Sequence, residues 1–196
     1  MNKSLKNTRN LTFLGLMLAI TVILDVSPLG AIPLGAISAT ITHIPTIITG
    51  VILGPIAGLI MGTLLGFVSL IHALTRPLTP FDPLFINPLV SVLPRMFIGV
   101  ASYYTFTAVS KFAKRPAGAV VAGIAGSLTN TVLVFLMLYI VYVKLWPVVE
   151  LASAFKAILI AVFTTNAIAE AIVSAILTVA VVMSYFDYTH RSEKIE

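Results

Sequence analysis

Cysteine is absent from the 196-residue chain, and charged residues are scarce, at 10% of the total. The missing cysteine excludes a disulfide framework and a thiolate metal site. The few charges exclude an ordinary soluble domain, in which about a quarter of the residues are charged. The phosphate-binding motif GxxxxGK[ST], the zinc motif HExxH and the esterase motif GxSxG are also missing. We therefore expect no enzyme activity, no bound metal and no cofactor.

Apolar runs fill most of the sequence, and 59% of the residues are hydrophobic. Windows of 18 or more apolar residues predict membrane-spanning helices. The alternating strand pattern of a membrane barrel does not occur. Turn-forming residues divide the runs into six segments, which predicts a single all-α integral membrane domain over residues 1–196. We expect its helices at about 11–24, 41–53, 56–74, 89–109, 118–143 and 156–185.

The basic residues predict the topology. The start of the chain resembles a signal peptide, but no small-x-small cleavage site follows, so we interpret it as a retained first helix. With the N-terminus in the cytoplasm of a bacterial plasma membrane, eight Lys and Arg fall inside and three outside, which fits the positive-inside rule. Such placement at helix ends disfavours a nucleic-acid surface. The inside set is Lys3, Lys6, Arg9, Lys111, Lys114, Arg115, Arg191 and Lys194, the outside set is Arg76, Lys144 and Lys156, and Arg95 lies within the fourth helix.

Small residues recur at every fourth position in three stripes, which run over four of the expected helices. Such a stripe is flat and lets another backbone approach closely. Two interpretations stay open for each stripe: packing within this chain, or docking against a separate membrane subunit. The stripes are Gly50, Gly54, Gly58, Gly62 and Gly66 across the second and third helices, Gly118, Ala122 and Gly126 in the fifth, and Gly15 and Ala19 in the first.

A few polar residues lie within or beside the apolar segments, where they are costly and often functional. At about 1.5 Å per residue, Arg95 lies about 10 Å below the outer surface, Asn166 about 15 Å, and Asn130 and Glu170 about 20 Å. This clustering predicts a pocket open to the outside. Structural roles are the alternatives: an Arg95–Glu170 pair, hydrogen bonds between helices for Asn130 and Asn166, and simple solvation for the histidines. The candidate binding residues are Arg95, Asn130, Asn166, Glu170, Asn87, His43 and His72.

The segment ITHIPTIITGVILGPIAGLIMGTLLG, together with six spans and about 200 residues, resembles the substrate-binding S component of an energy-coupling factor (ECF) vitamin transporter. The resemblance implies capture of a vitamin outside and delivery through a membrane coupling subunit and two cytosolic ATPases. It also implies that residues 26–40 form a lid over the ligand. The family's AxxxA motif, which contacts the coupling subunit, matches Gly15 and Ala19, with glycine at the first position.

The segments HIPTIITG and NPLVSVLPR most resemble the pantothenate-specific subgroup. Pantothenate carries a carboxylate, which Arg95 can bind, and an amide and two hydroxyls, which suit asparagine. Three alternatives stay open. They are an S component for another vitamin, a stand-alone transporter that uses Glu170 as its proton carrier, and a membrane protease, which the missing motifs disfavour.

Overall fold

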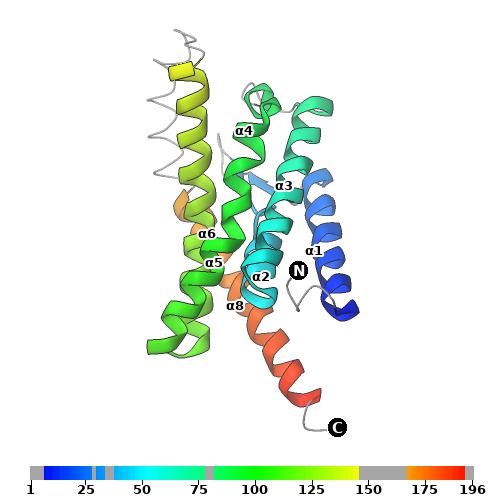
Figure 1. Ribbon diagram of the computed structural model, residues 1–196, viewed down its shortest axis with the longest axis vertical. Coiled ribbons are helices and arrows are strands. Elements are labelled where there is room, and N and C mark those ends of the chain that lie inside the picture. The colour runs from blue at the N-terminus through cyan, green and yellow to red at the C-terminus, as the bar shows by residue number, and fades with distance from the viewer. Residues whose placement is uncertain (1–6, 28–29, 34–37, 78–81, 146–166, 193–196) are drawn as a thin grey trace.

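Apolar helices make up most of the structure and pack side by side in one bundle (Figure 1). The computed structural model describes residues 7–27, 30–33, 38–77, 82–145 and 167–192. Within these residues, five helices are long and apolar enough to cross a membrane, and a sixth is shorter. The predicted all-α membrane fold is therefore confirmed. The elements are α1 (Thr8–Val26), β1 (Ala31–Pro33), β2 (Ser38–Thr40), α2 (Ile44–Leu53), α3 (Pro55–Thr75), the 3-10 helix η3 (Asp82–Ile86), α4 (Pro88–Ser91), α5 (Leu93–Phe112), α6 (Arg115–Leu138), the π-helical η4 (Tyr139–Leu145) and α8 (Ala167–Ser192).

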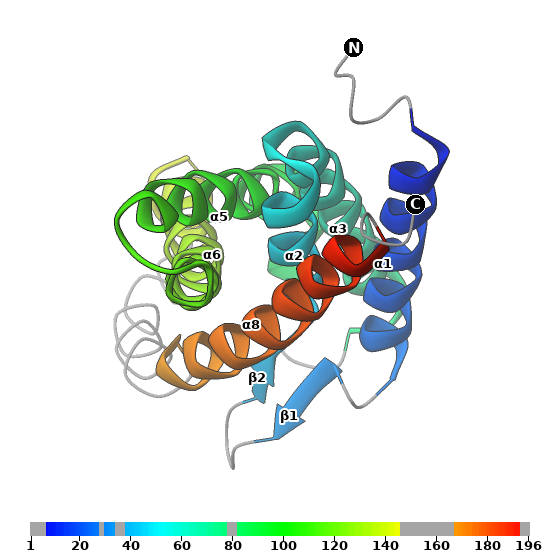
Figure 2. The ribbon, with the colours of Figure 1, turned by 90° about the horizontal axis from the view of Figure 1, so that it is seen from below.

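The short helix α2 lies at the centre of the bundle, in contact with α1, α3, α5, α6 and α8 (Figure 2). Nine of its ten residues are buried. The predicted break after this helix is confirmed. Gly54 adopts a φ of 98°, in the region that favours glycine. Pro55 is well suited to begin α3, because an N–H group in the first turn of a helix has no carbonyl acceptor within that helix.

Apart from Gly54, which lies at the turn, the glycine stripe of α2 and α3 packs within the chain against the α4–α5 segment. A Cβ added to Gly62 would collide with the Arg95 carbonyl, and one added to Gly58 would lie 2.9 Å from the Gly99 Cα atom. The stripe of α6 is likewise internal, because a Cβ on Gly126 would lie 2.6 Å from Ile47 Cγ1. For these two stripes, packing within the chain is the correct interpretation.

The stripe of α1 behaves differently. Gly15 and Ala19 are both exposed, and a Cβ added to Gly15 would meet nothing within 4 Å. Of the apolar stretch of α1, 11% is buried, against 33–39% in the other four long helices. The small residues of this helix therefore face away from the bundle.

Four local features differ from the predicted helices. The turn-rich segment after α1 contains an antiparallel hairpin, in which Ala31 pairs with Thr40 and Pro33 with Ser38. The predicted fourth helix is broken at Val92 into α4 and α5. The predicted fifth helix turns π-helical at Tyr139. The sixth ends at Ser192 rather than about residue 185, and its expected start at 156 lies outside the described residues.

The first turn of α1 and the last turn of α8 lie at the same end of the bundle (Figure 1). This agrees with both termini being on one side of the membrane. The cytoplasmic assignment of that side stays a prediction from the basic residues.

Candidate ligand-binding site

The side chain of Arg95 is fixed by the break between α4 and α5. Pro94 has no amide hydrogen, so the Val90 carbonyl, four residues earlier, receives no helical hydrogen bond from it. Arg95 Nη1 donates to that carbonyl at 2.9 Å and to the Ser91 carbonyl at 3.0 Å. Among the described residues, the hydrogen bonds of this guanidinium all come from Nη1. The Nε and Nη2 edge therefore suits a carboxylate, which accepts two parallel hydrogen bonds from arginine.

An aromatic ring covers the same guanidinium. The Cζ atom of Arg95 lies 5.0 Å from the centroid of the Phe85 ring, within the range of a cation–π interaction. Phe85 belongs to η3, and the neighbouring Leu84 carbonyl accepts a hydrogen bond from the Tyr142 hydroxyl at 2.8 Å. Segments from α4, η3 and η4 thus hold this one cation in place, around an apolar cluster of Val90, Val134, Leu138 and Val141.

Buried polar atoms without partners gather on α2 and α6. Seven buried side-chain atoms of the described residues lack a hydrogen-bond partner, and four of these belong to the two helices or to the residue that precedes α2. Native proteins satisfy nearly all such atoms, so a cluster of exceptions indicates a missing partner such as a ligand or water. The four are His43 Nδ1, Thr46 Oγ1, Ser127 Oγ and Asn130 Oδ1.

These four residues lie on one side of a tight contact between helices. Gly126 of α6 meets Ile47 of α2 and Ser102 of α5. Val51, one turn further along α2, belongs to the same core cluster as the earlier Ala119 of α6, which indicates that the two helices run in opposite directions. Residues before Ile47 and residues after Gly126 therefore lie on the same side, towards the end of the bundle that carries η3.

His43 connects this group to α8 and to Arg95. Its side chain is 1% exposed, so the expectation that it is simply solvated is wrong. The Nε2 atom lies 3.0 Å from Ser174 Oγ, within hydrogen-bonding distance. Ile47, one turn after His43, and Ile98, three residues after Arg95, belong to one core cluster, so the start of α2 and the Arg95 end of α5 lie together. His43, Arg95 and the unpartnered atoms of α6 thus form one polar interior, which we call the candidate site.

Glu170 is buried, with 7% of its surface exposed, but it does not pair with Arg95. Its Oε1 atom accepts hydrogen bonds from the backbone N–H and the hydroxyl of Thr40, at 2.7 and 3.0 Å. The ion pairs found among the described residues join Asp25 to His72 and to Arg76. An Arg95–Glu170 ion pair, one of the sequence-based alternatives, is therefore wrong.

Two other candidates have structural partners. His72 Nδ1 lies 3.1 Å from both carboxylate oxygens of Asp25, where it joins the end of α3 to the end of α1. Asn87 caps α4, because its Oδ1 accepts a hydrogen bond from the Leu89 N–H at 3.0 Å. These contacts explain both residues without a ligand, and their predicted binding roles stay untested.

Asn166 lies outside the described residues. The sequence analysis missed Ser174, Thr46, Ser127 and Phe85 as members or supports of the candidate site. The sequence did contain a signal for Ser174, because Glu170, Ser174 and Thr178 follow one another at intervals of four. All three are buried in the structure. An i, i+4, i+8 row of polar residues in an apolar helix marks a face turned towards the protein interior.

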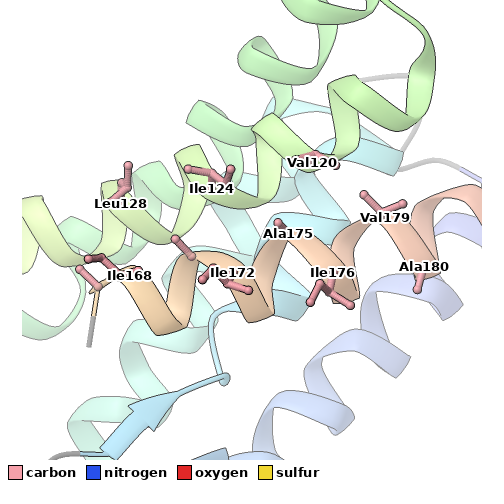
Figure 3. Close-up of a pocket in the computed structure, with 11 residues that line it drawn as sticks. Val120, Ile124, Leu128, Ile168, Ile172, Ala175, Ile176, Val179 and Ala180 are labelled. Atoms are coloured by element: carbon pink, nitrogen blue, oxygen red, sulfur yellow. The ribbon is translucent and has the colours of Figure 1, made fainter. Parts of the chain in front are cut away.

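A second hollow is apolar. It is a groove of about 880 Å³ between α6 and α8 (Figure 3). Its rim includes Ile168, Ile172 and Ile176, which are more than half exposed. A purely aliphatic lining offers nothing to a charged or hydroxylated ligand, so this groove does not suit such a ligand. A metal centre is also absent from the described residues, in which no three His, Cys, Asp or Glu side chains gather.

Two comparisons with known proteins gave matches. A family model described as "ECF transporter, substrate-specific component" matches residues 9–182. A curated relative is the pantothenic acid transporter PanT of Lactococcus lactis subsp. cremoris (strain MG1363). It is 28% identical over 159 residues, which cover 74% of this chain and 76% of the relative. The match to the family model covers nearly all of α1 and most of α8, and thus includes every described candidate residue.

Proposed function

Because the chain belongs to the family of substrate-specific components of ECF transporters, we propose that it captures pantothenate outside the cell for delivery through a membrane coupling subunit driven by two cytosolic ATPases. Membership makes it a multi-pass membrane protein and a transporter component rather than an enzyme. The choice of pantothenate is supported by the similarity to PanT. It is supported further by the chemistry of the candidate site.

The observation that carries the proposal is the environment of Arg95. A guanidinium inside a membrane domain is strongly disfavoured without a partner. Its Nη1 hydrogen bonds orient it, Phe85 covers one face, and no other part of the described chain binds the Nε and Nη2 edge, which suits an anion. A vitamin with one carboxylate supplies that anion, whereas a cationic vitamin would be repelled.

The unpartnered atoms match the rest of the ligand. Pantothenate has two hydroxyl donors and an amide, and Asn130 Oδ1 and Thr46 Oγ1 are acceptors without a donor. His43 Nδ1 is an acceptor or a donor according to its tautomer. We assign Arg95 to the carboxylate and Asn130, His43 and Asn166 to the hydroxyl and amide groups.

The partner interface is assigned to α1. Gly15 and Ala19 are exposed, while the other small-residue stripes are used within the chain. In a membrane, small residues at this spacing favour close helix–helix contact. An unused stripe therefore suits the coupling subunit.

Titration of pantothenate into the detergent-purified protein tests the ligand. Arg95→Gln should weaken binding by about 2–5 kcal/mol, or roughly 30- to several-thousand-fold, because the carboxylate then has no charged partner. Arg95→Lys should recover part of the loss, since the charge remains while the paired donors are lost. Arg76→Gln is the matched control, because this arginine pairs with Asp25 at the end of α3. Equal binding by wild type and Arg95→Gln would refute the role of Arg95, and a wild type that ignores pantothenate would refute the ligand.

A further inference from the structure

Glu170 makes its hydrogen bonds to the hairpin. Burying a carboxyl group is costly unless its oxygens accept hydrogen bonds. Here the donors are the N–H and the hydroxyl of a single residue, Thr40, which lies 130 positions away in the sequence. Thr40 is the last residue of β2. The contact therefore attaches the end of the hairpin to α8.

The geometry of the strand explains why the Thr40 amide is available. Ala31 lies opposite Thr40, and the next residue, Ile41, donates its N–H to the Gly30 carbonyl at 3.0 Å. Successive N–H groups of a strand point to opposite sides, so the Thr40 N–H points away from β1. Figure 2 shows the hairpin against α8, with β2 as the strand in contact. Glu170 thus satisfies the edge of β2 that β1 leaves open.

A second contact from the same face of α8 lies one helical turn further on. Ser174 follows Glu170 by four residues, so the two side chains share a face. Its hydroxyl lies 3.0 Å from Nε2 of His43, which is three residues after Thr40. The Nδ1 atom of the same imidazole is one of the unpartnered atoms of the candidate site. The chain that leaves the hairpin is therefore held at two points before it enters α2.

We propose that Glu170 is a positioning residue, whose carboxyl group holds the β1–β2 hairpin to α8 through Thr40 and thereby sets the position of His43. It acts on the ligand through the hairpin and not by direct contact. The attachment itself is independent of the ligand's identity. Its consequence, slower ligand release, rests on the proposed function.

Hydrogen–deuterium exchange on the full chain in lipid nanodiscs, without ligand, tests the attachment. A hydrogen bond to a carboxyl group changes the equilibrium between the attached and the detached hairpin by a factor of roughly ten. Glu170→Ala should therefore raise the exchange rate at Thr40 and Ile41 about tenfold. Glu170→Gln, which keeps an oxygen acceptor in place, should raise it less. Ile172→Ala is the control, since this exposed residue lies on the same helix. Protection unchanged by Glu170→Ala overturns the proposal.

If Glu170→Ala also increases exchange in α2, this substitution has disturbed the fold. In that case Thr40→Val tests the attachment of the hairpin instead. This substitution removes only the hydroxyl donor, and it should raise exchange about threefold at the hairpin alone. Unchanged exchange in Thr40→Val would then overturn the attachment.

Dissociation of radiolabelled pantothenate separates positioning from direct contact. Glu170→Ala and Thr40→Val should each speed release, and the double variant should release no faster than Glu170→Ala alone, because both act through one contact. If the effects of the two substitutions on the release rate instead multiply in the double variant, Glu170 contacts the ligand itself. That result would contradict the positioning role. If the wild type binds no pantothenate, the proposed ligand fails, and the exchange experiment still decides the attachment.

Discussion

Pro94 explains the orientation of Arg95, the most important side chain of the candidate site. It leaves the Val90 carbonyl without a helical donor, and Arg95 supplies that donor from its own side chain. The arginine is therefore oriented before any ligand arrives. Preorganised donors bind more tightly, because less freedom is lost on binding.

Phe85 offers a test of this preorganisation. Phe85→Leu keeps an apolar side chain but removes the ring face above the guanidinium, which should weaken pantothenate binding about 2- to 30-fold, the range of a cation–π interaction. Phe97→Leu is the control, because Phe97 is 45% exposed on α5. The measurement is the same titration in detergent. Equal affinities for Phe85→Leu and wild type would show that the ring does not support Arg95.

The sequence identified Arg95, Asn130, His43 and Glu170 as unusual because polar groups are rare in apolar helices. The sequence did not show which groups these side chains pair with. Glu170 and Thr40 are 130 positions apart, and nothing local indicates that a hairpin rather than Arg95 supplies the donors. Phe85 was missed because an aromatic residue in a loop between spans has no distinguishing pattern; its role depends on the stacking geometry alone.

At the scale of elements, the helices were predictable and the breaks only partly so. Apolar length gave the spans, and Gly54-Pro55 gave the turn between α2 and α3. The two-stranded hairpin was not predicted, because its strands have three residues each and lie among prolines and glycines. The π-helical end of α6 leaves no signal in a sequence that is apolar throughout.

The small-residue stripes look alike in sequence but differ in use, which predicts opposite effects of the same substitution. Gly62→Leu should destabilise the fold by about 1–3 kcal/mol or more, because α5 backbone atoms occupy the space. Gly15→Leu and Ala19→Leu should leave folding and pantothenate binding intact, since both positions are exposed, while abolishing uptake with the coupling subunit.

Thermal unfolding and ligand titration in detergent, followed by uptake in reconstituted vesicles, check these expectations. Gly62→Leu serves as the control for loss of the fold. If Gly15→Leu and Ala19→Leu lose ligand binding in step with uptake, α1 packs within this chain and its docking role is wrong.

At the scale of the whole molecule, the structure contains a polar interior next to α2, an exposed small-residue face on α1 and an apolar surface groove between α6 and α8. The sequence lacks the phosphate-binding motif GxxxxGK[ST]. A subunit that binds ligand but takes its energy from partners accounts for all of these features. A stand-alone proton-coupled transporter would instead use Glu170, whose oxygen already accepts two hydrogen bonds from Thr40.

Accumulation of radiolabelled pantothenate in proteoliposomes separates these two accounts most directly. The vesicles contain either this chain alone, with and without an imposed proton gradient, or this chain with a coupling subunit and its two ATPases. The account predicts accumulation only with the complete assembly and ATP. Accumulation by the chain alone, driven by the proton gradient, would contradict it.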